Sequence, residues 1–263
     1  MDVAESIGAG PSGRLWEGKT AIVTGGAYGI GAAIAAQGVA DGGQVWIFDV
    51  DDEAGEATAQ RIGDACRYLH VDVTDEQAIT AAVAEIVAAT GRVDILVNNA
   101  CGDANEDAVS MSVERWDAIM RLNLTSAWLV SRAVLPSMLE VGEGSIVNIG
   151  SLHARLTEEG AFPYAVGKAG LGGLTRSLAL ECGPKGVRVN MVCPGWTRSE
   201  RVEAMFERVG SERVAEIENT HALRRVATPA DIAPTVSFIA SDRAAFVTGA
   251  TWEVDGGLGS RFA

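Results

Sequence analysis

The chain has 263 residues, a formal net charge of -14 and a hydrophobic share of 48%. This length suits one sizeable α/β domain, and the hydrophobic share is too high for a disordered chain. The acidic balance argues against a nucleic-acid partner, because no basic surplus is present to neutralise phosphates.

The N-terminus and the cysteines narrow the class further. Residues 1–13 contain two acids, no basic region and no long apolar run, so we expect a flexible tail and no signal peptide. No apolar run reaches the roughly 18 residues of a membrane span, which predicts a cytoplasmic protein without a membrane partner. The four cysteines show no C-x-x-C spacing and the three histidines are scattered, so we expect reduced thiols and no metal site.

Apolar runs alternate with helical segments along the whole chain. The predicted strands are 20–24, 44–50, 66–73, 93–100, 144–150, 187–193 and 250–254. The predicted helices are 29–42, 51–63, 74–91, 112–139, 162–182 and a later one opened by Thr228 and Pro229. Nearly continuous apolar strands separated by helices indicate βαβ units and a sheet covered on both faces. The predicted fold class is therefore α/β, a single-domain Rossmann-type doubly wound parallel sheet over residues 14–263.

Two local features refine this outline. Thr74 is the expected N-cap of the helix predicted over residues 74–91, and Gln77 completes a capping box. The longest stretch without a strand lies between Cys193 and Thr251. Because such an insertion follows the carboxyl end of a strand, we expect a substrate lid around residues 195–226.

A glycine-rich turn, TGGAYGIG (24–31), joins the first strand to the first helix. Glycines allow a pyrophosphate to approach the backbone closely, and the following helix N-terminus favours an anion. A tight turn between a strand and a helix also needs glycine for purely structural reasons, so the turn alone does not decide the function.

Asp49, at the end of the second strand, adds to the case for a nucleotide. A carboxylate there can accept hydrogen bonds from both ribose hydroxyls and repels a 2′-phosphate. The alternative is that Asp49 caps the next helix together with Asp51 and Asp52. No Arg or Lys lies in the glycine turn or directly after Asp49. These features predict NAD rather than NADP as the cofactor.

Further motifs follow in order, and together they resemble the short, single-domain type of the short-chain dehydrogenase/reductase family. The resemblance runs from about Leu15 to Gly259. Its motifs are the three-residue spacing of Gly25 and Gly29, DVT (72–74), NNA (98–100), Asn123, Ser151 followed thirteen positions later by Tyr164-x-x-x-Lys168, CPGWT (193–197) and VDGG (254–257). There are two departures. Cys101 replaces the glycine that usually follows NNA, so the resemblance does not predict the conformation of this loop, which often lines the substrate pocket. Gly150 replaces the first serine of a frequent Ser-Ser pair.

The resemblance implies a set of functional residues. The implied cofactor contacts are Gly25, Tyr28, Gly29, Ile30, Asp49, Asp72, Val73, Asn99, Ala100, Tyr164, Lys168, Pro194, Gly195 and Thr197. The implied catalytic residues are Asn123, Ser151, Tyr164 and Lys168. The family also suggests a homotetramer, or a homodimer.

The chemistry of the Tyr-x-x-x-Lys pair supports this assignment. Tyr164 and Lys168 are four apart on a predicted helix and therefore share one face. A phenol ionises near pH 10, and a nearby ammonium lowers its pKa, so Tyr164 is a candidate general acid/base. Ser151 would stabilise the substrate oxygen. The spacing alone is common by chance; the other motifs give it weight.

By resemblance, Lys168 would also bind the nicotinamide ribose. Asn123 would disrupt its helix and anchor a water that relays protons from Lys168. The alternative for Asn123 is an ordinary amide within a helix.

Three residues are candidates for substrate contact besides Ser151 and Tyr164. His153 resembles the histidine of sugar and 3-hydroxyacid dehydrogenases of the family, and Arg155 could pair with an anion. Each could equally be a solvated loop residue. Trp196 could line the lid or pack on the lid's own helix.

The sequence thus predicts an NAD(H)-dependent oxidoreductase that interconverts a secondary alcohol and a carbonyl. The expected substrate is small and polar, such as a sugar, polyol or hydroxy acid. One alternative is an NADPH-dependent 3-oxoacyl or steroid-type ketone reductase, against which Asp49 argues. Another is a catalytically silent NAD-binding sensor or scaffold, which would be expected to lose Ser151, Tyr164 or Lys168.

Overall fold

The computed structural model describes residues 13–102 and 105–260. At its centre lies a seven-stranded sheet in the order β3-β2-β1-β4-β5-β6-β7, with every neighbouring pair parallel. The strands are β1 (Thr20–Thr24), β2 (Gln44–Asp49), β3 (Cys66–His70), β4 (Ile95–Asn98), β5 (Gly144–Ile149), β6 (Val187–Pro194) and β7 (Thr251–Val254). The strand order reverses between β1 and β4, and open α/β sheets bind ligands beyond the carboxyl ends at such a point.

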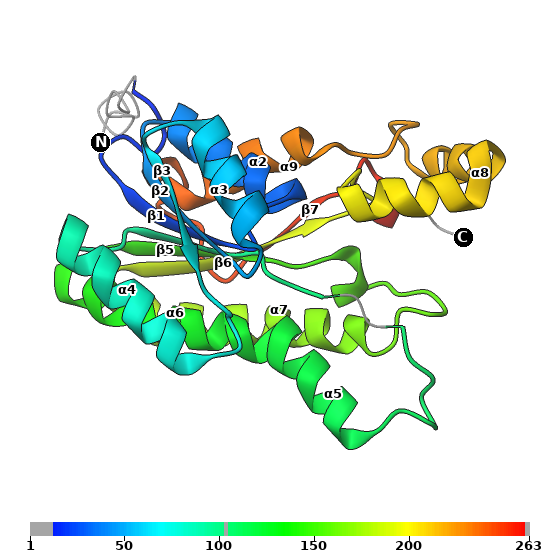
Figure 1. Cartoon of the computed structure of the whole chain (residues 1–263), viewed down its shortest axis with the longest axis horizontal. Coiled ribbons are helices and arrows are strands. Elements are labelled where there is room, and N and C mark those ends of the chain that lie inside the picture. The colour runs from blue at the N-terminus through cyan, green and yellow to red at the C-terminus, as the bar shows by residue number, and fades with distance from the viewer. Residues whose placement is uncertain (1–12, 103–104, 261–263) are drawn as a thin grey trace, which may run out of the picture.

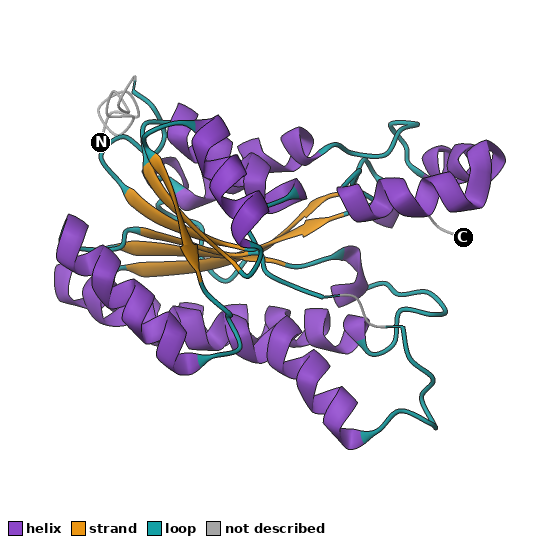
Figure 2. Cartoon of the chain, in the orientation of Figure 1, coloured by secondary structure: helices purple, strands orange, loops and turns teal. Residues whose placement is uncertain are grey.

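Helices cover both faces of the sheet (Figures 1 and 2). One face carries α2 (Gly29–Ala40), α3 (Asp52–Ile62) and α9 (Pro229–Ala240). The other carries α4 (Glu76–Thr90), α6 (Ser126–Val141) and α7 (Tyr164–Cys182), with α5 (Val113–Met120) next to α6 in the chain. The helix α8 (Glu200–Thr220) extends past the sheet, where the lid was expected. The predicted α/β doubly wound fold is confirmed.

The sheet has a hydrophobic core on each face, because successive side chains along each strand point to alternate faces. Ile22 and Leu96 belong to the core under α4 and α6, whereas Val23 and Val97 belong to the core under α2 and α9. All four side chains are completely buried. Because consecutive side chains point to opposite faces, a strand buried on both faces has to be apolar at every position.

The capping prediction for α4 is wrong by one residue. Asp75, not Thr74, is the N-cap, and its carboxylate accepts hydrogen bonds from the amides of Gln77 and Ala78. The Thr74 hydroxyl instead donates to Asp72 at 2.7 Å. An aspartate at this position is as good a cap as a threonine, so the two choices were close on sequence grounds.

The long helix predicted over residues 112–139 is interrupted. A π-helical turn, Arg121–Thr125, separates α5 from α6. Such turns are rare and occur frequently at functional sites. The helix predicted from Phe162 begins two residues later, at Tyr164, because Pro163 takes the N-cap position.

The ends of the chain are only partly described. Residues 1–12 of the predicted tail lie outside the described residues, and the domain is anchored from Trp16, which is fully buried and donates to the Ser237 carbonyl. Within residues 13–102 and 105–260, every helix is too short or too polar to cross a membrane.

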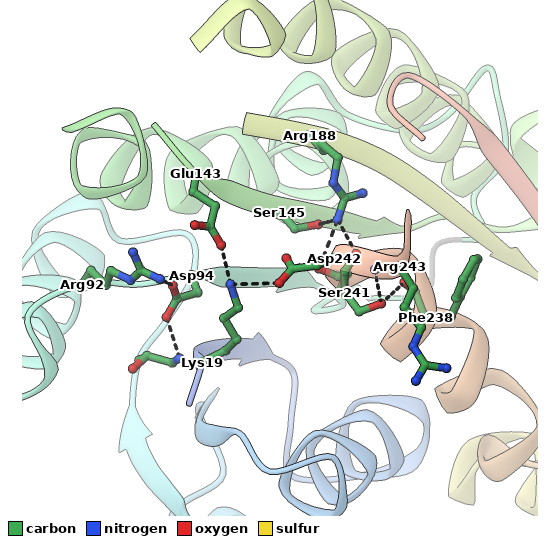
Figure 3. Close-up of polar contacts among 12 residues, drawn as sticks. Lys19, Arg92, Asp94, Glu143, Ser145, Arg188, Phe238, Ser241, Asp242 and Arg243 are labelled. Carbon is green, nitrogen blue, oxygen red and sulfur yellow. Dashed lines mark hydrogen bonds and ion pairs between the residues drawn. The ribbon is translucent and has the colours of Figure 1, made fainter. Parts of the chain in front are cut away.

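A network of charged side chains ties the amino ends of the strands together (Figure 3). Lys19, before β1, pairs with Glu143 and Asp242, and Arg92 pairs with Asp94. The Arg188 guanidinium donates to the carbonyls of Ile239, Ala240, Ser241 and Val247 and to the Ser145 hydroxyl. The last carbonyls of α9 have no partner within the helix, so Arg188 supplies their missing donors.

We therefore expect Arg188→Met to lower the free energy of unfolding by about 2–4 kcal/mol, because the methionine keeps the packing volume but leaves buried carbonyls without donors. Urea denaturation measures the change. Arg208→Met, at an exposed position of α8, serves as the control and should change stability by less than about 0.5 kcal/mol. Equal stability of the two variants would contradict the role given to Arg188.

Candidate active site

The glycine turn after β1 forms a cradle that admits no side chain. Gly25 and Gly29 have positive φ angles of 63° and 50°. A Cβ on Gly25 would lie 2.9 Å from the Ala100 Cα, and one on Gly31 would lie 2.0 Å from the Gly25 carbonyl oxygen. The first turn of α2 carries no acid, so its free amides and helix dipole favour an anion.

Tyr28 and Ile30 flank this cradle. Tyr28 is the N-cap residue of α2, but its side chain makes no capping bond. Its hydroxyl instead donates to Asp51 at 2.6 Å, and this bond raises the pKa of Tyr28 to about 12. Ile30 is half-buried and packs on the core below α2. Both residues therefore lie beside the glycine turn, as their sequence position requires.

Thr24 and Asn99 join the glycine turn to the end of β4. The Asn99 amide group donates to the carbonyls of Thr24 and Gly25 at 3.0 and 2.9 Å. In return, the Thr24 hydroxyl accepts from the backbone amides of Asn99 and Ala100, both at 3.0 Å. Asn99 and Ala100 thus set the position of the turn. Thr24 was not foreseen, because a threonine at the end of a β-strand carries no distinguishing signal.

Asp49 faces the glycine turn and does not cap a helix. Its carboxylate accepts from the backbone amides of Ala27 and Val50 at 3.1 and 2.8 Å. Asp51 is the N-cap of α3 and accepts from the Ala54 amide at 3.0 Å. The alternative interpretation of Asp49 as a helix cap is therefore wrong, and its carboxylate lies at the edge of the cradle.

The DVT segment follows β3 at the same edge of the sheet. The Asp72 carboxylate accepts from both the amide and the hydroxyl of Thr74, which shapes the turn into α4. Val73 is buried in the core. These contacts fix the loop where the resemblance places two cofactor contacts, without testing those contacts.

Tyr164 and Lys168 form a buried pair on the first turns of α7. Lys168 is only 2% exposed, and its ammonium donates to the Ile149 carbonyl at 2.8 Å and lies 5.5 Å from the centre of the Tyr164 ring. Burial raises the pKa of Tyr164, against the opposing effects of the Lys168 charge and a hydrogen bond with Ser151. For the chain alone the net shift is upward, which differs from the expected lowering, because burial of the phenol outweighs the ammonium.

The pKa of Lys168 itself is raised. Burial acts to lower it, but the negative charges that Tyr164, Cys101 and Cys193 can carry act in the opposite direction and prevail. The ammonium also donates a hydrogen bond to the Ile149 carbonyl at 2.8 Å. A positive charge beside a phenol favours the phenolate form that a tyrosine general base requires.

Ser151 and Asn123 complete the predicted catalytic set. Ser151 follows β5, accepts from the His153 amide at 3.2 Å and is hydrogen-bonded to Tyr164. Asn123 is 3% exposed and lies in the π-helical turn, where its side chain accepts from the Gly102 amide and donates to the Ile119 carbonyl. The predicted disruption of its helix is present.

The three candidate substrate residues have different surroundings. The His153 ring lies edge-on to Tyr164, with centroids 5.8 Å apart, and its Nδ1 is 3.2 Å from the Thr157 hydroxyl. The Arg155 guanidinium makes two hydrogen bonds to the Glu253 carboxylate, at 2.8 and 3.0 Å. His153 therefore faces Tyr164, whereas the charge of Arg155 already has a partner.

Trp196 packs against α8, the helix in the region where a lid was expected. Its ring lies 6.3 Å from that of Phe206 of α8, in a cluster that also contains Ile217 and Val226. This agrees with the interpretation that Trp196 packs on the helix of its own segment. The tryptophan joins the segment after β6 to α8 and so helps to set the position of that helix.

The segment after β6 brings the remaining predicted residues to the same end of the sheet. Pro194 ends β6, and the Gly195 amide donates to the Val254 carbonyl at 3.1 Å. Thr197 is buried and donates from its hydroxyl to the Gly195 carbonyl at 3.1 Å. Every predicted site residue therefore lies at or next to the carboxyl ends of the strands.

Two further residues act on Tyr164 and Lys168 and were not among the residues predicted to be catalytic. The charges of Arg201, in the first turn of α8, and of Cys101, after β4, both influence the pKa values of Tyr164 and Lys168. Cys101 is exposed, and the other three cysteines are buried and free. Arg201 had no signal in the sequence, because only the placement of the lid brings it near α7.

Comparisons with known proteins agree with this geometry. The model of the family described as "Enoyl-(Acyl carrier protein) reductase" matches residues 25–259. A 3-alpha-(or 20-beta)-hydroxysteroid dehydrogenase of Mycobacterium tuberculosis is 40% identical over 94% of this chain and 91% of that protein. A 3-oxoacyl-[acyl-carrier-protein] reductase of Vibrio cholerae is 36% identical over 92% of this chain and 98% of that protein.

A solved structure gives the same result. The ligand-free aldohexose dehydrogenase of Thermoplasma acidophilum superposes with a TM-score of 0.86 at 33% identity, over 94% of this chain and 96% of that one. Each of these relatives matches more than nine-tenths of the chain. The chain belongs to the short-chain dehydrogenase/reductase family of oxidoreductases.

Proposed function

We propose that the protein is an NAD(H)-dependent oxidoreductase that interconverts a secondary alcohol and a carbonyl, with Tyr164 as the general acid/base. The observation that carries the proposal is the buried Lys168 ammonium beside the Tyr164 phenol and the Ser151 hydroxyl. This trio lies at the end of the sheet that also bears the glycine cradle. Members of the family bind a nicotinamide cofactor, and the choice of NAD is part of the proposal.

The described residues fit a dinucleotide. The cradle at Gly25 and Gly31 has room for backbone contact alone, which suits close approach of a pyrophosphate. The Asp49 carboxylate at its edge suits ribose hydroxyls and opposes a 2′-phosphate. A bound nicotinamide would supply the hydride acceptor or donor. Asp49 argues against the NADPH-dependent alternative.

The chain's own residues would handle the proton and the substrate oxygen. Ser151 would donate a hydrogen bond to that oxygen and stabilise its negative charge. Tyr164, as phenolate, would remove the alcohol proton in oxidation, and as phenol would return it in reduction. Lys168 would stabilise the phenolate through its charge. Asn123, in the π-helical turn, would hold a water that relays protons from Lys168.

For the substrate, we propose a small polar molecule such as a sugar, polyol or hydroxy acid. His153 supports this, since its ring faces Tyr164 while Nδ1 is engaged by Thr157, which leaves Nε2 for a second hydroxyl or a carboxylate. The name of the aldohexose dehydrogenase points the same way. The hydroxysteroid and 3-oxoacyl relatives favour a larger apolar ketone, which is the second candidate.

We also propose that copies of the chain associate through the edge of β7. Phe246, in the segment before β7, is fully exposed at 105%, and Trp252 and Phe238, exposed at 37% and 36%, form an edge-to-face pair. Large exposed aromatic side chains around an unpaired strand edge are typical of an interface. The family expectation of a homotetramer, or a homodimer, suits this surface.

Tyr164→Phe tests the proposed chemistry directly. With NAD and a panel of sugars, polyols, hydroxy acids and hydrophobic secondary alcohols, the native protein should form reduced nicotinamide, measured by absorbance. The variant should lose about 10²- to 10⁴-fold in kcat, because it retains the ring but not the acid/base group. Its Kd for NAD should stay within about twofold. Tight NAD binding without turnover across the panel would favour the silent sensor, and full activity of the variant would contradict the mechanism.

The cofactor preference depends on Asp49. The native protein should favour NAD over NADP in kcat/KM by about tenfold or more. Asp49→Ser should reduce that preference, because the change removes the repulsion of a 2′-phosphate. Asp64→Ser, at an exposed position, removes the same charge elsewhere and should leave the preference unchanged. A native preference for NADP would show that the role of Asp49 is misassigned.

The pKa of Tyr164 should respond to Lys168 even without cofactor. Lys168→Met should raise that pKa further, because burial then acts unopposed by the ammonium. The phenolate absorbance during alkaline titration, taken as a difference from the corresponding Tyr164→Phe protein, isolates this tyrosine from Tyr28 and Tyr68. Lys185→Met, on the surface, should have no effect. An unchanged or lower pKa in Lys168→Met would rule out the charge coupling.

A further inference from the structure

The first turn of α8 lies directly over the glycine turn. A Cβ built on Gly29 would lie 3.3 Å from the Cβ of Ser199 and 3.4 Å from the Oε2 of Glu200. These are ordinary to close contact distances, so a carboxylate oxygen borders the space above Gly29. The first turn of α2 has no acidic residue, so α2 itself places no negative charge at the cradle. The lid helix α8 brings an acid to it.

Glu200 differs from the other acid in this turn. The Glu203 carboxylate bonds to Arg198 at 2.9 and 3.1 Å. Glu200 is exposed and, among residues 13–102 and 105–260, its carboxylate makes no hydrogen bond or ion pair. No bonded partner in the described part of the chain therefore offsets the negative charge of Glu200.

The position of this charge conflicts with the ligand that the cradle suits. A pyrophosphate at a glycine turn lies against the backbone and the helix N-terminus. The turn at Gly29 is the one that would receive it. A carboxylate a few ångströms away repels that anion, and the repulsion is reduced but not abolished by solvent and salt.

We propose that Glu200 acts as a built-in electrostatic competitor of the cofactor pyrophosphate, which weakens dinucleotide binding and speeds its release. The inference rests on the proposed dinucleotide-binding function and adds a residue that regulates that site. Glu200 touches no reacting atom. It would set how long the cofactor stays bound, and release steps limit turnover in many enzymes.

A competing explanation is that Glu200 only stabilises its own helix. An acid in the first turn interacts favourably with the helix dipole. On that account, removing the charge would loosen the N-terminus of α8 and leave the cofactor affinity the same or lower. The electrostatic account predicts the opposite direction, and only for ligands that carry the pyrophosphate.

The test is calorimetric titration of NAD, ADP and adenosine into the native protein, Glu200→Gln and Glu207→Gln. Glu207 is exposed on the same helix, so its variant matches the change in net charge. Glu200→Gln should lower the Kd for NAD and ADP by about three- to tenfold, less at high salt, and leave adenosine unchanged. Stopped-flow displacement should show slower NAD release. Glu207→Gln should behave as the native protein.

Each other outcome overturns the inference in a distinguishable way. An unchanged or higher Kd for NAD in Glu200→Gln would overturn it while leaving the proposed function intact. An equal gain for adenosine would assign the effect to packing of the lid rather than to charge. If the native protein bound neither NAD, NADP nor ADP, the proposed function itself would fail and this inference with it.

Discussion

The site depends on one buried charge. Lys168 is 2% exposed, and its ammonium is stabilised by the Ile149 carbonyl and by its proximity to the Tyr164 phenol. A charge removed from water has to be compensated by hydrogen bonds and opposite charge, or it is lost. Here the end of β5 supplies the carbonyl, and the start of α7 supplies the phenol. The same burial that makes the ammonium costly also gives it strong influence over its neighbour.

The two ends of the sheet use charge differently. At the amino ends, Lys19 and Arg188 are occupied by carboxylates and helix carbonyls, so their charges serve the fold (Figure 3). At the carboxyl ends, the Lys168 ammonium donates to a backbone carbonyl and has no carboxylate partner within residues 13–102 and 105–260, and its charge acts on Tyr164. Asp49 likewise keeps its carboxylate at the edge of the cradle, where its bonding partners among the described residues are all backbone amides. Polar groups left without charge partners at strand ends are what a binding site requires.

Much of the fold and of the site could be predicted because it depends on local pattern. Continuous apolar strands indicated burial on both faces, and the spacing of Tyr164 and Lys168 placed them on one helix face. Thr74 and Asp75 are adjacent and both suit an N-cap, so the sequence did not identify the cap of α4 correctly. In the structure the Thr74 hydroxyl donates to Asp72, and Asp75 caps the helix. The engagement of Arg155 by Glu253, ninety-eight positions away, could not be foreseen from either neighbourhood.

The least predictable part was the lid. Glu200 and Arg201 are neighbours on one polar helix, and nothing in that helix tells which charges face the site. Only the packing of Trp196 on Phe206 and the position of Ser199 over Gly29 bring them there. The net direction of the Tyr164 pKa was also out of reach, since it is the difference between a burial effect and a charge effect, and burial is a property of the folded molecule.

The most direct test of the account is the pH dependence of NAD-dependent alcohol oxidation, compared with the phenol titration of the same protein without cofactor. If Lys168 and a bound oxidised nicotinamide together drive Tyr164 to its phenolate, kcat/KM measured with NAD already saturating should rise with pH through a pKa well below that of the cofactor-free phenol. A kcat/KM that rises only at the pKa of the cofactor-free phenol would contradict the central claim that this buried pair performs the proton transfer. The same holds if the rise with pH persists in Tyr164→Phe.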